Sequence, residues 1–124
     1  MIDTPSVPKP RESTWLWLFK IISGLLIVVF LGIHFVVNHL LAPQGLLTYE
    51  EVILYFKNPI VPVMEVLFLV FVIAHSLTGL RSIFLDLNPS DKLLRVVDIV
   101  FIVAGVGFAV YGIWLAWVIA STSV

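Results

Sequence analysis

The sequence predicts an all-α integral membrane protein, in which three transmembrane helices form one membrane-anchor domain over residues 1–124. Hydrophobic residues make up 60% of the chain and charged residues 12%, with a mean hydropathy of +1.11. Soluble domains average about 45–50% apolar and 25% charged. Three apolar runs, Trp15–Leu41, Ile60–Leu85 and Leu94–Ala120, each exceed the roughly 20 residues that cross about 30 Å of hydrocarbon. Backbone groups in lipid must bond within their own segment, so each run is expected to be a helix.

The segment before the first helix, residues 1–12, is polar and contains three prolines and mixed charges. This composition does not fit a cleaved signal peptide, and we expect a short tail that docks on a soluble partner. The net charge of −1 gives no indication of a nucleic-acid partner. The absence of cysteine excludes a cysteine-ligated iron–sulfur cluster, a disulfide and covalently attached haem in this chain.

Local signals mark where the second and third helices begin. Pro62 fits the first turn of the second helix, where its missing N–H costs little. The second connection contains Asn88-Pro89-Ser90-Asp91, a turn in which the serine or the aspartate can cap the third helix. In the third helix, close packing against another helix is expected at three glycines: Gly105, Gly107 and Gly112.

Basic residues gather at one end of the predicted bundle. They lie near the start of the first helix or around the second connection: Lys9, Arg11, Lys20, Arg81, Lys92 and Arg95. The first connection, residues 42–59, holds a single base, Lys57. The positive-inside rule then places the N-terminus and the second connection in the cytoplasm and the C-terminus outside. We expect the cell (inner) membrane of a prokaryote.

The most informative stretch is His75-Ser-Leu-Thr-Gly79-Leu-Arg81-Ser-Ile-Phe-Leu-Asp86. A histidine inside hydrocarbon is costly without a partner, and such residues are mostly functional. Gly79 lies one turn later on the same face and leaves room for a bulky neighbour. We interpret His75 as an axial ligand of haem iron and Arg81 as a two-pronged partner of a haem propionate. The alternatives are a hydrogen bond across a helix pair for His75 and a headgroup anchor for Arg81.

Depths counted along the helices separate the histidines. At about 1.5 Å per residue, His75 lies about 16 Å from Asp86, and His34 lies about 28 Å from Trp15. The two histidines therefore differ in depth by roughly 10 Å, and one iron cannot bind both. A six-coordinate haem at His75 would take its opposite ligand from another polypeptide. His34 is a candidate ligand of a second, outer haem, with a hydrogen bond to a neighbouring helix as the alternative.

Two further polar residues near the outer end, His39 and Glu65, are interpreted as interfacial. His39 lies five residues after His34, on a different face of the same helix.

The pattern His-x3-Gly-x-Arg-x4-Asp over His75–Asp86 resembles the second membrane helix of the cytochrome b anchor subunits of succinate dehydrogenase (respiratory complex II). Residues 49–59 look like the pre-helix segment of the hydrophobic anchor chain. The segment Trp17–Gly24 is similar to the Ser-Gly motif of the family's first helix. The resemblance covers nearly the whole chain.

The resemblance implies a role for particular residues. His75 would be an axial ligand of haem b, and Arg81 a neighbour of a propionate or of the quinone. Ser23 would line a ubiquinone or menaquinone pocket, with Lys20 and Asp86 as the other polar groups at that depth. The sequence departs from the family where arginine usually precedes the Ser-Gly motif, at Ile21, and where tyrosine often follows the aspartate, at Leu87.

The resemblance also implies partners and a mechanism. A flavoprotein subunit oxidises succinate, an iron–sulfur subunit passes the electrons on, and a second membrane anchor subunit helps this chain to hold one or two haems b and to form the quinone site. This chain would do no succinate chemistry itself. Two alternatives are kept: the anchor of a fumarate reductase, and a cofactor-free packing or assembly subunit of another membrane complex.

Overall fold

The computed structural model describes residues 12–42 and 44–123. Their elements are α1 (Thr14–Phe35), continued by a π-helical turn (Val36–Leu40), α2 (Tyr49–Phe56), α3 (Ile60–Asp86) and α4 (Asp91–Ser121). The described residues contain no strand. Three segments are long and apolar enough to cross a membrane: Thr14–Leu40, Ile60–Asp86 and Asp91–Ser121. The prediction of a helical membrane protein with three spans is confirmed.

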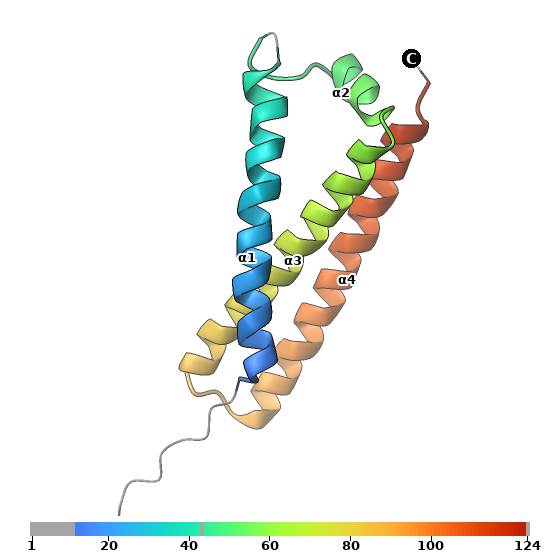
Figure 1. Cartoon of the computed structure of the whole chain (residues 1–124). Helices are drawn as coiled ribbons and strands as arrows, with labels where there is room; N and C mark the ends of the chain where they lie inside the picture. The colour runs from blue at the N-terminus through green and yellow to red at the C-terminus, as the bar shows by residue number, and fades with distance from the viewer. Residues whose placement is uncertain (1–11, 43, 124) are drawn as a thin grey trace, which may run out of the picture.

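The helix α3 runs antiparallel to α1 and to α4 (Figure 1). It packs against both of them. The start of α1, the end of α3 and the start of α4 lie together at what we call the lower end, as drawn in Figure 1. The short helix α2 and the end of α4 lie at the upper end. Lys20, Arg81, Lys92 and Arg95 thus gather toward the lower end, as the sequence predicts.

Two of the three long helices, α1 and α4, begin at a serine whose side chain caps the helix. The Ser13 hydroxyl accepts a hydrogen bond from the Leu16 N–H at 3.3 Å, and the Ser90 hydroxyl accepts one from the Leu93 N–H at 3.3 Å. Because Ser90 occupies the N-cap, α4 begins three residues before the predicted Leu94. Pro62 lies in the first turn of α3, as predicted.

The first connection contains a helix that the apolar runs do not reveal. Thr48 and Glu51 form a reciprocal capping box at the start of α2, with bonds of 3.3 and 2.7 Å. The Ile53 side chain is buried. Lys57, at the end of α2, donates to the carbonyl oxygens of Ala120 in the last turn of α4 and of Thr122 just after that helix. The connection is therefore folded back onto the upper end of the bundle.

Two of the three glycines expected at close packing lie where α3 and α4 touch. A Cβ built on Gly105 would lie 2.8 Å from Leu77 Cδ1, and one on Gly112 would overlap the Leu69 side chain. A Cβ on Gly107 would meet no atom of this chain within 4 Å. The packing prediction is therefore confirmed for Gly105 and Gly112, whereas Gly107 faces open space.

Gly112→Ala is expected to destabilise the α3–α4 pair, because the added methyl group must displace Leu69. Overpacking of this kind typically costs about 1–3 kcal/mol. The thermal midpoint of the purified complex measures the loss. Gly107→Ala is the matched control and should leave the midpoint unchanged, while Leu69→Ala combined with Gly112→Ala should recover part of the loss. Equal midpoints for the Gly112 and Gly107 variants would contradict this packing.

Few side chains in the described residues are buried: Ser23, Ala42, Ile53, Val61 and Ala116. Large apolar side chains along all three long helices are exposed, with Val28 at 67% and Val103 at 67% as examples. A span with such faces is compatible with lipid and with further apolar helices, but not with water.

Candidate functional site

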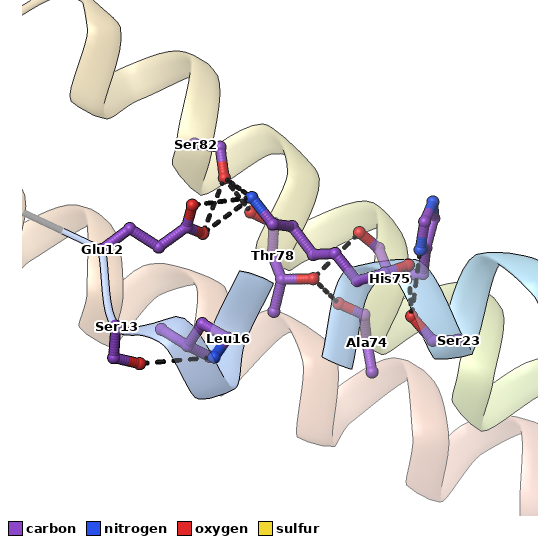
Figure 2. Close-up of polar contacts among 9 residues, drawn as sticks. Glu12, Ser13, Leu16, Ser23, Ala74, His75, Thr78 and Ser82 are labelled. Atoms are coloured by element: carbon purple, nitrogen blue, oxygen red, sulfur yellow. Dashed lines mark hydrogen bonds and ion pairs between the residues drawn. The ribbon is translucent and has the colours of Figure 1, made fainter. Parts of the chain in front are cut away.

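His75 contacts α1 at the level of Ser23 and Gly24, and Figure 2 shows its ring beside the Ser23 side chain. Its Nδ1 lies 3.1 Å from the Ser23 hydroxyl oxygen. The Ser23 hydroxyl also donates to the Lys20 carbonyl oxygen at 3.2 Å, and the Ser23 residue is only 1% exposed. Gly24 leaves room for the ring, because a Cβ at that position would crowd His75 Cε1 at 3.1 Å. The imidazole is thus held against α1 by one hydrogen bond and by a glycine.

The face of α3 that follows His75 has room for a bulky group. A Cβ built on Gly79, one turn after His75, would meet no atom of this chain within 4 Å. Both residues are half-buried. His75 and Gly79 are therefore compatible with a haem site: the histidine is fixed on one side, and there is unfilled space beside it on the same helix face.

A charged cluster ties the start of α1 to α3 below His75. The Lys20 ammonium lies 2.7 Å from Glu12 Oε1 and donates to the Ser82 hydroxyl at 2.6 Å. Ser82 also lies 3.0 Å from Glu12 Oε1, and Thr78 donates to the carbonyl oxygens of Ala74 and His75 (Figure 2). Sequence reasoning placed Lys20 at this depth but did not find its partners.

The Glu12 carboxylate carries a pKa below its ordinary value. The largest cause is the hydrogen bond from Lys20, which outweighs the opposing effect of burial, while Ser82 and the charges of Lys20 and Arg81 act in the same direction as that bond. A carboxyl group with a lowered pKa stabilises the folded state above its unfolded pKa of about 4.3. That stability is lost as the pH falls through the folded-state value.

The start of α1 is therefore expected to loosen from α3 on acidification below about pH 4. Amide hydrogen exchange near Glu12 should become faster over that pH range. In Glu12→Gln the exchange should already be faster at pH 7 and should depend less on pH. A wild-type exchange profile that is flat through this range would contradict the ion pair.

Arg81 forms an ion pair with Asp98 of α4. Arg81 Nε and Nη2 donate to the two carboxylate oxygens at 2.6 and 3.1 Å, and the side chains are 22% and 34% exposed. This two-pronged contact leaves Nη1 outside the pair. The predicted propionate partner is thus an arginine with one carboxylate already bound, and sequence reasoning did not single out Asp98.

A groove of about 570 Å³ runs between α3 and α4 above this ion pair. Arg81, Asp98 and Thr78 line its polar end, and apolar side chains such as Leu77 and Phe101 line the rest. Its shape suits a molecule with a polar head and an apolar tail. Asp86, the last residue of α3, is exposed and lies apart from this groove.

His34 and Glu65 form a second polar contact, nearer the upper end. His34 Nδ1 lies 3.0 Å from Glu65 Oε1, and Asn38 donates to the His34 carbonyl oxygen at 2.8 Å. The Glu65 side chain is 16% exposed. Glu65 was interpreted as interfacial, yet here it binds a histidine across α1 and α3. Its charge also adds to burial in raising the pKa of Tyr55 on α2.

The two membrane histidines are farther apart in depth than the sequence estimate. Ser23 marks the level of His75 on α1, and His34 follows it by eleven residues, which is about 16 Å. The estimate of roughly 10 Å counted residues from the end of each helix, as if the two helices were parallel. Because α1 and α3 cross at an angle (Figure 1), that count misjudges which residues lie at the same level. His39 lies beyond the end of α1, where its Nδ1 is 3.0 Å from the Gly45 carbonyl oxygen.

The described residues contain no group of three or more histidine, cysteine, aspartate or glutamate side chains placed to hold a metal ion. An axial haem ligand is a different arrangement, because the porphyrin supplies four nitrogens and a chain need contribute only one side chain. His75, which has room beside it at Gly79, is compatible with that requirement.

Taken together, the described part of the chain is a three-span membrane unit with polar contacts at two depths. Residues 6–106 match the family described as succinate dehydrogenase/fumarate reductase transmembrane subunit. The chain belongs to this family, as the resemblance predicted.

The chain is also similar to individual curated proteins. It is 31% identical over 80% of its length to the succinate dehydrogenase hydrophobic membrane anchor subunit of Archaeoglobus fulgidus, of which it covers 84%. It is 29% identical over 83% of its length to the protein of the same name from Thermoplasma acidophilum, again covering 84%. A shorter match, 38% over 58% of this chain and 52% of the relative, is to succinate dehydrogenase 2 membrane subunit SdhC of Mycobacterium tuberculosis. No solved structure matches.

Membership has two direct consequences. The chain is an integral membrane protein and a membrane anchor subunit. As an anchor subunit, it is one of several subunits of a larger complex.

Proposed function

We propose that this anchor subunit belongs to a succinate:quinone oxidoreductase and binds haem b through His75. The observation that carries the proposal is the placement of His75, fixed against α1 by Ser23 with a glycine-made space one turn away at Gly79. Bound haem supplies one-electron transfer. The chain's own part is to hold the imidazole at a fixed angle and to keep water from it with apolar neighbours.

A second histidine for a haem held by His75 would come from the second membrane anchor subunit. The chain has three histidines, and neither His34, about 16 Å higher along α1, nor His39 can reach an iron held by His75. Coordination by two histidines leaves no open iron position, which suits electron transfer and not oxygen chemistry. Arg81 Nη1 would bind a propionate while Asp98 holds the rest of the guanidinium.

A second haem at His34 is the lesser part of the proposal. Histidines that bind metals commonly donate their other ring N–H to a carboxylate, and Glu65 lies at that position on His34 Nδ1. The competing role is a histidine–carboxylate pair that only joins α1 to α3. Haem stoichiometry separates the two.

Quinone is proposed to bind at the lower end, which faces the cytoplasm under the positive-inside rule. Lys20, Asp86 and Ser23 were predicted as its polar contacts. Lys20 is the strongest candidate of the three for a quinone contact, because its half-buried ammonium lies between α1 and Ser82 of α3. Asp86 is exposed and could take part in proton delivery. An iron–sulfur subunit would pass electrons to this site from a flavoprotein that oxidises succinate.

Lys20→Ala is expected to impair quinone reduction and to spare succinate oxidation by a soluble acceptor. Loss of a charged donor typically costs about 1.5–3 kcal/mol, so we expect roughly a tenfold or greater rise in the KM for quinone. Lys92→Ala removes an exposed base at the same end and is the matched control. Equal quinone kinetics in the two variants would place the pocket elsewhere.

The defining experiment is a haem assay on the purified complex. Dithionite-reduced minus oxidised spectra and pyridine haemochrome quantitation should give sharp haem b bands and one or two haems per complex. Two haems that fall to one in His34→Ala would support the outer haem, and one haem in the wild type would exclude it. A complex without haem would instead support the cofactor-free packing subunit.

The direction of catalysis is the remaining alternative. The family includes transmembrane subunits of fumarate reductases, whereas the relatives named above are succinate dehydrogenase subunits. We therefore propose succinate oxidation, which steady-state rates in both directions would test.

A further inference from the structure

Ser23 is the most deeply buried polar side chain among the described residues. At 1% exposure it has little surface to offer a quinone, and its oxygen already has two partners. Those partners are a backbone carbonyl of its own helix and an imidazole nitrogen of α3 (Figure 2). Outside its own helix, the Ser23 hydroxyl group therefore interacts with the His75 imidazole.

Both contacts are hydrogen bonds at the same time in only one arrangement of the protons. A hydroxyl group has one proton to donate and two lone pairs. The Lys20 carbonyl oxygen can only accept, so it takes the Ser23 proton at 3.2 Å. If the Ser23 proton goes to Lys20, the Ser23 oxygen faces His75 Nδ1 at 3.1 Å as an acceptor, and Nδ1 carries the N–H. A neutral imidazole has a single N–H, so the lone pair lies on Nε2.

The position of the ring is restricted as well. Gly24 brings the α1 backbone to the edge of the imidazole, where even a methyl group would lie 3.1 Å from Cε1. The ring thus has a hydrogen bond at Nδ1 and lies in the space that a side chain at position 24 would crowd. This arrangement orients Nε2 before any ligand binds.

We propose that Ser23 is a positioning residue for haem, which accepts the His75 Nδ1–H bond and so presents Nε2 to the iron. The inference rests on the proposed function, since it needs haem at His75. An acceptor on the far nitrogen makes an imidazole a more basic ligand, which favours the ferric state. Loss of such a partner typically lowers metal affinity roughly 10- to 100-fold.

The test is the reduction potential and spectrum of haem in the assembled complex. In Ser23→Ala the potential should rise and the low-spin spectrum should shift, while succinate oxidation by a soluble acceptor is unchanged. Ser23→Thr keeps the hydroxyl and should restore both. Ser76→Ala removes an exposed serine next to His75 and is the control, with wild-type values expected.

The outcomes are distinguishable from failure of the proposed function. If His75→Ala removes haem but Ser23→Ala keeps the wild-type potential and spectrum, Ser23 is not a positioning residue. A higher KM for quinone in Ser23→Ala, at an unchanged potential, would overturn the inference and support the quinone role. If Ser23→Ala loses haem and Ser23→Thr keeps it, the positioning role of Ser23 is supported. Equal loss of haem in both variants would contradict that role. A haem retained in His75→Ala would instead refute the proposed function.

Discussion

His75→Ala is expected to remove haem b from the assembled complex or to convert it to a five-coordinate form. One histidine from a partner subunit cannot hold a six-coordinate iron, and the space beside Gly79 offers no replacement ligand. The reduced optical bands measured on complex of verified subunit composition report the loss. This is the largest effect that the structure predicts for any single substitution.

The control for this experiment is His39→Ala, which removes a histidine at the upper end that contacts the Gly45 carbonyl oxygen and the Phe35 ring. Its haem spectrum should match the wild type. An unchanged spectrum in His75→Ala would refute the assignment of His75. Tyrosine is a poor substitute at this position, because a phenolate can itself bind iron.

Asp98→Leu is expected to destabilise the complex, because it leaves Arg81 without its carboxylate at the α3–α4 contact. Breaking a buried pair costs about 3–5 kcal/mol, whereas an exposed pair contributes about 0–1 kcal/mol. With side chains about a quarter to a third exposed, we expect a loss on the order of 2 kcal/mol. The thermal midpoint of the complex measures it.

A double-mutant cycle isolates the pair. Arg81→Leu combined with Asp98→Leu should be less damaging than the sum of the single variants, since neither charge is then left unpaired. Arg95→Leu removes an exposed base from α4 and should have little effect. A coupling energy near zero would show that Arg81 and Asp98 act independently.

Local sequence signals predicted the fold well where they depend on a single helix. Hydropathy located three spans, Pro62 fitted the first turn of α3, and Ser90 was a correct cap for α4. The short helix α2 was missed, although Thr48-x-x-Glu51 carries the capping-box spacing. That signal precedes only eight helical residues, which are too few to be recognised as a helix from hydropathy alone.

The candidate site was only partly predictable, because its contacts join different helices. The sequence singled out His75, Lys20 and Ser23, but it could not show that Ser23 faces His75. Such pairing depends on how far each helix is rotated about its axis, which hydropathy does not report. Asp98 and Glu65 were missed as partners for the same reason: each binds a residue of another helix, Arg81 and His34 respectively.

The matching of charges inside this chain bears on the order in which the complex is made. Each of the four charged residues well within the spans has an opposite charge or a histidine from the same polypeptide: Lys20 with Glu12, Glu65 with His34, and Arg81 with Asp98. No buried side-chain nitrogen or oxygen among the described residues lacks a hydrogen-bond partner. A freshly inserted chain can therefore give each of these side chains a partner of its own in the bilayer. Biogenesis would then proceed by docking of a preformed three-helix unit, and this subunit should persist in membranes of cells that lack the second anchor chain.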